Sequence, residues 1–157
     1  GMKTDDCRIP DSFRLAGEAG MEISFGEAEL KDAHPNSAQL ILTGADGRQL
    51  EIVGESIGGS RINIASIDGL SANFSGDYPT LIVRNIDQPG HVMEVTAMLG
   101  HKGVNIATLQ LFRQSRGGQA AMVIECDQEV PAESIKWLSR QEGIVKVTYL
   151  SQAQRED

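Results

Sequence analysis

The second half of the chain constrains the fold most, because strand-like and helix-like apolar periods alternate there in a fixed order. In the first predicted helix, Val92, Val95, Met98 and Leu99 share one face, and Gly103 ends it. A Gly-rich turn at 116–118 separates two later apolar runs. We predict helices that begin at 87–90 and at Pro131, and strands at 80–86, 104–114, 119–127 and 144–150.

This order is β-α-β-β-α-β within about 75 residues, which is the split βαβ arrangement of ferredoxin-like domains. It predicts a four-stranded antiparallel sheet with both helices on one face. Such a sheet has exposed edge strands, and side-by-side pairing of two copies hides them. We therefore expect a homodimer formed through this domain.

The first half has a different pattern. A short helix is predicted at 9–21, and Met21, Ile23 and Phe25 alternate as in a strand. Turns at 45–47 and 68–69 lie between apolar runs and predict β-hairpins, so residues 21–75 are predicted to form one antiparallel meander.

The periodicity breaks at 75–80, where Gly, Asp and Pro occur together. We predict an α+β protein with two domains. Residues 1–75 form a partial, β-rich domain and residues 76–157 the ferredoxin-like one.

Composition excludes several classes of function. With 157 residues, 40% of them apolar, the chain can bury a core. A net charge of −8 argues against nucleic acid and anionic membranes as partners. The absence of a spanning apolar run and of a signal-peptide pattern gives the expectation of a cytoplasmic protein without a membrane partner.

Two cysteines, Cys7 and Cys126, lie far apart without metal-ligand spacing. We interpret them as incidental or buried thiols; the alternatives are a disulfide or half of a metal site. An iron–sulfur cluster held by this chain alone normally needs four ligands. We predict no metal or cofactor site in this chain.

The segment 85–106 contains the candidate ligand site. Asp87 precedes the helix, Pro89 presets φ for its first turn, and Gly90 allows close backbone approach. Asp87 is either a helix cap or part of a site in which the helix N–H groups receive a carboxylate. Asn85 and Asn105 supply further short polar side chains for a small zwitterion.

The combination of "DQPG", an apolar helix and "GVNIA" resembles the ACT domain, a small regulatory module that usually binds amino acids between two copies. The resemblance covers residues 78–150. It places ligand contacts on Asn85, Asp87, Gly90, Asn105 and Ile106. Serine-sensing members often have His and Asn where this chain has Asn85 and Asp87, and an Asp meets an ammonium well but a carboxylate badly.

A second candidate site lies in "GESIGGS", where glycines at 54, 58 and 59 permit an unusual backbone turn. One interpretation is an anion-binding nest at Ser56, Gly58 and Gly59. The alternative is a bulge between strands.

"HPN" at 34–36, "GESIGGS.I.I" and the ACT-like region, in this order, resemble the β chain of bacterial iron–sulfur L-serine dehydratase. Residues 1–75 are then similar to part of the allosteric substrate binding domain of that chain. The family's β chain begins with a longer segment containing Gly-Pro-Ser-Ser-Ser-His, which this sequence lacks, so the resemblance covers its later two-thirds.

The resemblance implies a regulatory or structural β subunit of an enzyme that converts L-serine to pyruvate and ammonia. It implies an α-chain partner that carries the 4Fe–4S cluster, and a small amino acid such as L-serine as effector. The alternative is a free-standing ACT amino-acid sensor, or the regulatory part of a D-3-phosphoglycerate dehydrogenase.

We assign no catalytic residue, because no Ser/His/Asp or Cys/His arrangement can be assembled. His34 is expected to make a structural hydrogen bond rather than act in catalysis. His91 and His101, together with Glu125 and Asp127, are expected to be exposed.

Overall fold

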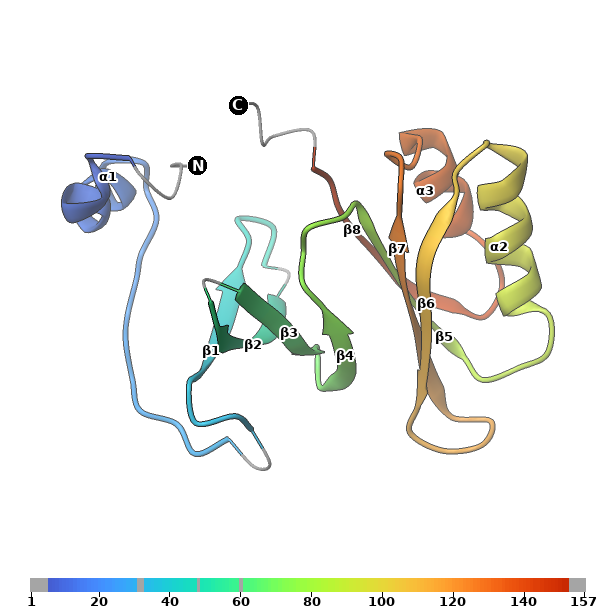
Figure 1. The fold of residues 1–157 in the computed structure, drawn as a ribbon, viewed down its shortest axis with the longest axis horizontal. Coiled ribbons are helices and arrows are strands. Elements are labelled where there is room, and N and C mark those ends of the chain that lie inside the picture. The colour runs from blue at the N-terminus through green and yellow to red at the C-terminus, as the bar shows by residue number, and fades with distance from the viewer. Residues whose placement is uncertain (1–5, 31–32, 48, 60, 153–157) are drawn as a thin grey trace. The chain divides into compact units, whose positions relative to one another are not determined.

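The computed structural model describes residues 6–30, 33–47, 49–59 and 61–152, and it divides the chain into two compact units, 1–31 and 32–157 (Figure 1). The second unit contains strands that belong to both of the predicted domains. The boundary at 75/76 stays a prediction.

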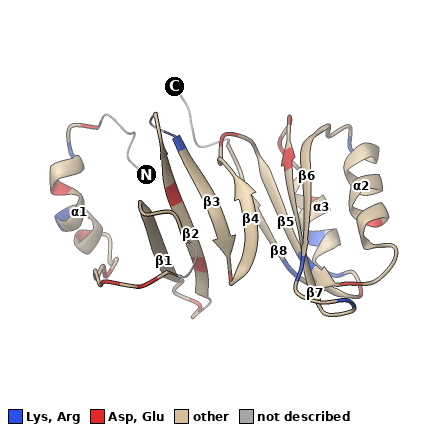
Figure 2. Cartoon of the chain, turned by 60° about the horizontal axis from the view of Figure 1, so that its bottom comes forward, with Lys and Arg blue, Asp and Glu red and all other residues tan. Residues whose placement is uncertain are grey.

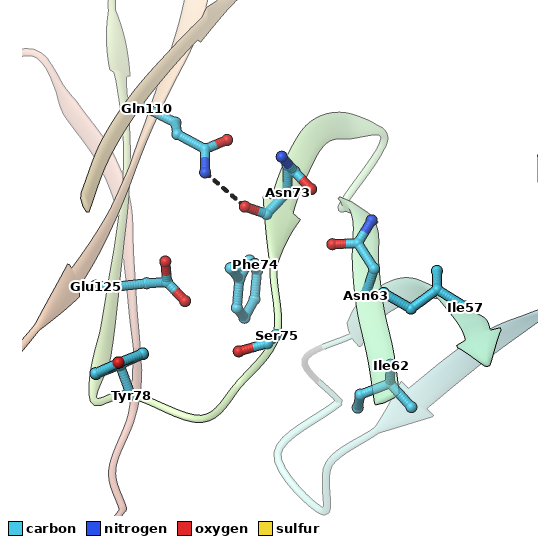
Figure 3. A pocket seen from close by; sticks show the side chains of 9 residues that line it. All are labelled: Ile57, Ile62, Asn63, Asn73, Phe74, Ser75, Tyr78, Gln110 and Glu125. Atoms are coloured by element: carbon cyan, nitrogen blue, oxygen red, sulfur yellow. Dashed lines mark hydrogen bonds between the residues drawn. The ribbon is translucent and has the colours of Figure 1, made fainter. Parts of the chain in front are cut away.

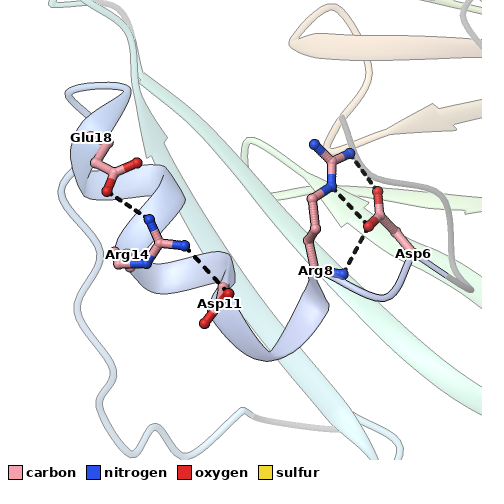
Figure 4. Close-up of polar contacts among 5 residues, drawn as sticks. All are labelled: Asp6, Arg8, Asp11, Arg14 and Glu18. Carbon is pink, nitrogen blue, oxygen red and sulfur yellow. Dashed lines mark hydrogen bonds and ion pairs between the residues drawn. The ribbon is translucent and has the colours of Figure 1, made fainter.

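The first unit contains a 3₁₀ turn, η1 (Ile9–Asp11), and the helix α1 (Ser12–Glu18). Arg14 donates to Glu18 on the next turn and to Asp11 at the helix start, and both ion pairs are exposed (Figure 4). Exposed pairs of this kind contribute little to stability.

The strand predicted at 21–25 is wrong, because residues 21–30 form neither helix nor strand. Phe25 is 83% exposed and makes an edge-on contact with Phe13 at 5.6 Å between ring centroids. A strand needs a hydrogen-bonded neighbour, and alternation of apolar residues does not supply one. The meander therefore begins at Ser37 instead of 21.

We call the first sheet the meander sheet. It consists of β1 (Ser37–Thr43), β2 (Gln49–Gly58), β3 (Arg61–Ile67) and β4 (Leu70–Phe74), hydrogen-bonded in chain order. Both predicted hairpins are confirmed. At the β3–β4 turn Asp68 and Gly69 have φ of 49° and 73°, the positive values that a tight two-residue hairpin requires.

The second sheet, called the ferredoxin-like sheet, follows the predicted β-α-β-β-α-β order. Its elements are β5 (Thr80–Ile86), α2 (His91–His101), β6 (Ile106–Arg113), β7 (Gln119–Cys126), α3 (Ala132–Leu138) and β8 (Ile144–Leu150). The strand order is β6-β7-β5-β8 and all neighbours are antiparallel. The predicted α+β class and the ferredoxin-like arrangement are confirmed.

The two faces of the ferredoxin-like sheet have different covers. Helices α2 and α3 lie on one face and the meander sheet lies on the other, as two views agree (Figures 1 and 2). The helix side holds the larger core, which includes Leu81, Val95 and Leu138. On the other side Phe74 of β4 packs with Val123 of β7.

A partly buried ionic contact also joins the two sheets. Asp68, in the β3–β4 turn, accepts hydrogen bonds from Lys146 at 2.5 Å, Arg84 at 3.4 Å and the Glu51 backbone N–H at 3.1 Å. Burial alone raises the pKa of the Asp68 carboxyl, but these hydrogen bonds and charges together lower it. The meander sheet is thus attached to β5 and β8 by charge as well as by apolar packing.

Candidate functional site

The predicted ligand residues at the exit of β5 do lie close together. Asn85 is 5% exposed, and its Nδ2 donates to the Ile86 carbonyl at 2.7 Å. Among the described residues its Oδ1 has no hydrogen-bond partner. A buried amide oxygen without a hydrogen-bond partner costs free energy.

Asp87 does not cap the helix, so that interpretation is wrong. Its carboxylate accepts from the Gly117 N–H at 3.1 Å and from Arg113 at 3.3 Å, both on or beside the β6–β7 hairpin. Its own N–H donates to the Gly118 carbonyl at 2.8 Å. Helix α2 begins instead after Gly90, whose φ of 105° turns the chain into the helix without a side-chain cap.

His91 was expected to be exposed, and this is wrong. It is the first residue of α2, and Gly90 turns it inward to the start of β8, where its Nε2 lies against Gly143. Any side chain at 143 would collide with the imidazole. His91 Nε2 has no hydrogen-bond partner among the described residues, and Glu94 lies 3.7 Å from Nδ1.

Asn85 Oδ1 and His91 Nε2, two buried atoms without a hydrogen-bond partner among the described residues, therefore both lie near the start of β8. Asn85 pairs with Ile144 in the sheet, and His91 contacts the preceding Gly143. No local pattern in the sequence indicates this arrangement for His91, because a histidine after Pro-Gly is expected to lie at the surface. The burial follows from the β5–α2 turn.

Asn105 and Ile106 lie at the opposite end of the sheet. Asn85 pairs with Ala120 of β7, whereas Ile106 pairs with Cys126, six positions further along the same strand. Six strand residues correspond to about 20 Å. Asn105 is held there by Asp127, to which its Nδ2 donates at 2.6 Å. One copy of the chain therefore does not bring all five predicted residues together.

The second candidate site is built as a hairpin. Gly58 and Gly59 have φ of 83° and 62° at the turn between β2 and β3, and the strand register shifts between Ser56 and Gly58. The Ser56 N–H already donates to the Asn36 carbonyl at 2.9 Å. These features are those of the bulge alternative; the anion site stays a prediction.

The remaining polar residues divide between exposed and buried positions. His101 is exposed as expected, and His34 accepts from the Asn36 N–H at 3.1 Å, the structural hydrogen bond that was predicted. The expectation that Glu125 is exposed is wrong. Its exposed fraction is only 7%, and its carboxylate accepts a hydrogen bond from the Thr108 hydroxyl at 2.6 Å. The alternation of β7 could have revealed it, since Glu125 shares a face with buried Val123.

Side chains that can ligate metals, and the two cysteines, are dispersed within the described part of the chain. Among the described residues, no three His, Cys, Asp or Glu side chains are grouped to hold a metal ion. Burial raises the pKa of the Cys126 thiol to about 11, with Asp127 adding to the effect, so this thiol stays protonated near neutral pH. Cys7 is exposed. Within the described residues, no helix is long and apolar enough to span a membrane.

Comparison with known proteins decides the family. The chain is 30% identical over 148 residues to a probable L-serine dehydratase, beta chain, of Bacillus subtilis, which covers 94% of this chain and 67% of that protein. The chain belongs to the L-serine dehydratase beta-chain family. It is also 31% identical over 137 residues to the L-serine dehydratase, beta chain, of Peptoniphilus asaccharolyticus, with 87% of this chain and 61% of that one covered.

This member of the family thus spans about two-thirds of the length of these relatives, as the resemblance implied. A more distant likeness joins it to D-3-phosphoglycerate dehydrogenase of Methanocaldococcus jannaschii, at 29% identity over 129 residues, which is 82% of this chain and 24% of that enzyme. No family model matches the chain.

Proposed function

We propose that this chain is a regulatory and structural β subunit of a heteromeric L-serine dehydratase, and that it supplies no catalytic group. The observation that carries the proposal is the likeness to two L-serine dehydratase beta chains over most of the sequence. The partner is an α chain, and the reaction converts L-serine to pyruvate and ammonia in the cytoplasm.

The 4Fe–4S cluster belongs to the α chain in this proposal. Such clusters are usually held by four cysteine thiolates, and this sequence has two cysteines. One of them, Cys126, is buried and keeps its proton near neutral pH. On the α chain, the cluster supplies a Lewis acid for the serine hydroxyl. The role of this chain is to transmit ligand occupancy or docking to that chain as a coupling free energy, typically about 1–3 kcal/mol.

The regulatory ligand is a small amino acid, such as L-serine, bound between two copies of the ferredoxin-like sheet. Its strand β6 is an edge strand. Exposed apolar side chains on β6, Leu109 and Leu111, and on α2, Val92 and Met93, support a second copy on this side.

A two-fold axis that pairs the β6 edges antiparallel explains the separation of the predicted ligand residues. It sets the start of one β6, with Asn105, beside the end of the other. That end carries Arg113, the ion-pair partner of Asp87. The Asn85 oxygen, which has no partner among the described residues, and the Asp87 carboxylate offer acceptors for the ligand's ammonium group. The first-turn N–H groups of α2, which a helix leaves without an intrahelical partner, suit its carboxylate.

The subunit role is tested by anaerobic affinity capture from a lysate of the source organism, with this chain as bait. The expected result is a bound iron–sulfur protein and serine-dependent pyruvate formation in the captured fraction. A bait with α3 and β8 removed serves as the misfolded control. Capture without pyruvate formation or an iron–sulfur protein would contradict the proposal.

The alternative is a free-standing amino-acid sensor or the regulatory part of a phosphoglycerate dehydrogenase, and the likeness to the archaeal dehydrogenase is the observation behind it. A sensor binds L-serine by calorimetry but captures no α chain. A dehydrogenase part captures an NAD-dependent activity instead. The dimer itself is tested by sedimentation at tens of micromolar, where a monomer would contradict the β6 pairing.

A further inference from the structure

A pocket of about 440 Å³ lies between the meander sheet and the ferredoxin-like sheet, on the side of β7 away from the helices (Figure 3). The pocket is widely open to solvent, so it can enclose a small ligand only in part. It is separate from the exit of β5, because Glu125 pairs with Thr80 at the other end of that strand. The lining residues are Ile57, Ile62, Asn63, Asn73, Phe74, Ser75, Tyr78, Gln110 and Glu125.

Glu125 is the unusual member of this lining. Carboxylates are rarely more than nine-tenths buried unless they are paired, yet Glu125 is 7% exposed. Among the described residues its hydrogen-bond donor is the neutral Thr108 hydroxyl, which reaches Oε2 at 2.6 Å. Figure 3 shows the carboxylate pointing into the pocket, towards Phe74 and Ser75. A carboxylate has about four acceptor sites, so most of this capacity remains open.

The other polar groups in the pocket add acceptors rather than positive charge. Gln110 donates through Nε2 to the Asn73 carbonyl at 2.6 Å, which fixes the amide, and its oxygen points away from Glu125 (Figure 3). Among the described lining residues none is Lys, Arg or His. The charge of the pocket is therefore negative, and a cation complements it.

The remaining walls limit the size and character of the ligand. Phe74 is buried in the middle of the pocket, and Ile57 and Ile62 are about half exposed at its side. Ser75 and Tyr78 offer hydroxyl groups at the loop that joins the two sheets. A short ligand with one charged end and a small hydroxylated or apolar body fits these surroundings.

We propose that this pocket binds a small ligand through an ammonium group, with Glu125 as counter-ion. The ammonium belongs either to a simple amine or to an amino acid. A ligand here contacts both sheets at once, so its binding stabilises their contact. The proposal is independent of the amino-acid site between two copies, and each can fail alone.

Nuclear magnetic resonance titration of the full chain with three probes tests this site. Ethanolamine has an ammonium and a hydroxyl, L-serine adds a carboxylate, and L-lactate has the carboxylate and hydroxyl without the ammonium. The side-chain amides of Asn73 and Gln110 report on the pocket, and those of Asn85 and Asn105 report on the other site. Very small ligands reach dissociation constants of about 1–10 mM, so the titration extends to tens of millimolar.

We expect ethanolamine to shift the resonances of the Asn73 and Gln110 side-chain amides, and L-lactate to leave them unchanged. The result with L-serine decides the class of ligand. A shift with L-serine as well assigns the site to amino acids, and a shift with ethanolamine alone assigns it to simple amines. Equal shifts with L-lactate, or no shift of these two amides with either ammonium probe, would overturn the proposal. Shifts confined to Asn85 and Asn105 would also overturn it while supporting the site between copies.

Glu125→Gln removes the charge, keeps the shape and keeps an acceptor for Thr108. We expect it to weaken ethanolamine binding at least tenfold, since charge-assisted hydrogen bonds are the strong ones. Glu27→Gln, an exposed position in the first unit, is the matched control and should leave binding unchanged. If Glu125→Gln does not fold, Ser75→Phe, which fills the pocket from its loop, takes its place. Unchanged ethanolamine affinity in a folded Glu125→Gln or Ser75→Phe variant would overturn the proposal.

Discussion

The two four-stranded sheets of this protein bury their strands to very different degrees. In β5 of the ferredoxin-like sheet, Leu81 and Val83 are completely buried under the helices, and Ile82 faces the meander sheet. In β1 of the meander sheet, three successive side chains, Leu40, Ile41 and Leu42, are about half exposed or more.

The difference follows from what covers each sheet. The ferredoxin-like sheet has a cover on both faces, whereas among the described elements of the second unit the meander sheet is covered on one face, and β1 is its edge strand. An exposed edge with apolar side chains is an unusual surface for a protein that acts alone. We therefore expect the free energy of unfolding to depend mainly on the ferredoxin-like sheet, and the meander sheet to depend on contacts with it.

The largest expected effect is at Leu81. Leu81→Ala opens a cavity in the core under the helices, and it should lower the free energy of unfolding by about 2–5 kcal/mol. Urea denaturation followed by circular dichroism measures the change. A loss below about 1 kcal/mol would show that the helix-covered core is not the main source of stability.

Asp68 is expected to have an intermediate effect, because it joins the two sheets. Asp68→Asn keeps the side-chain shape and tolerates the positive φ, but it loses the charge that faces Arg84 and Lys146. We expect a loss of about 1–3 kcal/mol at pH 7, with the share of Lys146 reduced because it is partly exposed to solvent.

The pH dependence of this effect has a definite sign. The pKa of Asp68 is lowered in the folded protein, so its contribution is complete above the unfolded value of about 4 and disappears as the pH falls through the folded value. The stability difference between wild type and Asp68→Asn should therefore shrink between pH 7 and pH 2.5 in urea denaturation. A constant difference would show that the variant acts by altering the turn.

Leu42 is expected to have the smallest effect and provides the matched control for Leu81. The same change, Leu42→Ala, removes a side chain that is 49% exposed in β1. We expect a loss below about 1 kcal/mol by the same denaturation measurement. A loss as large as that of Leu81→Ala would mean that β1 is covered in solution, for example by another chain.

Local signals in the sequence predicted most of the fold. The period of 3.6 on α2, the period of 2 on the strands and the glycines at turns gave the ferredoxin-like order and both hairpins. The segment 21–25 failed because a strand depends on a partner that is distant in sequence, and alternation alone cannot show whether one is present.

The candidate site was less accessible from sequence. Asn85, Asp87 and Gly90 follow one another along the chain, so local reasoning placed them at one end of the sheet. The separation of Asn105 from them depends on β5 and β6 running in the same direction, which is a property of the topology. Burial of His91 and Glu125 depends likewise on what packs over them.

The central claim is that two copies build the amino-acid site together, with Asp87 from one and Asn105 from the other. The most direct test mixes two variants, Asp87→Ala and Asn105→Ala, after refolding them together, and measures L-serine binding by calorimetry. Each variant alone should bind at least tenfold more weakly than wild type. The mixture should recover wild-type affinity in about one quarter of its sites, because each mixed dimer has one intact site. A mixture that binds no better than its two parents would contradict the account.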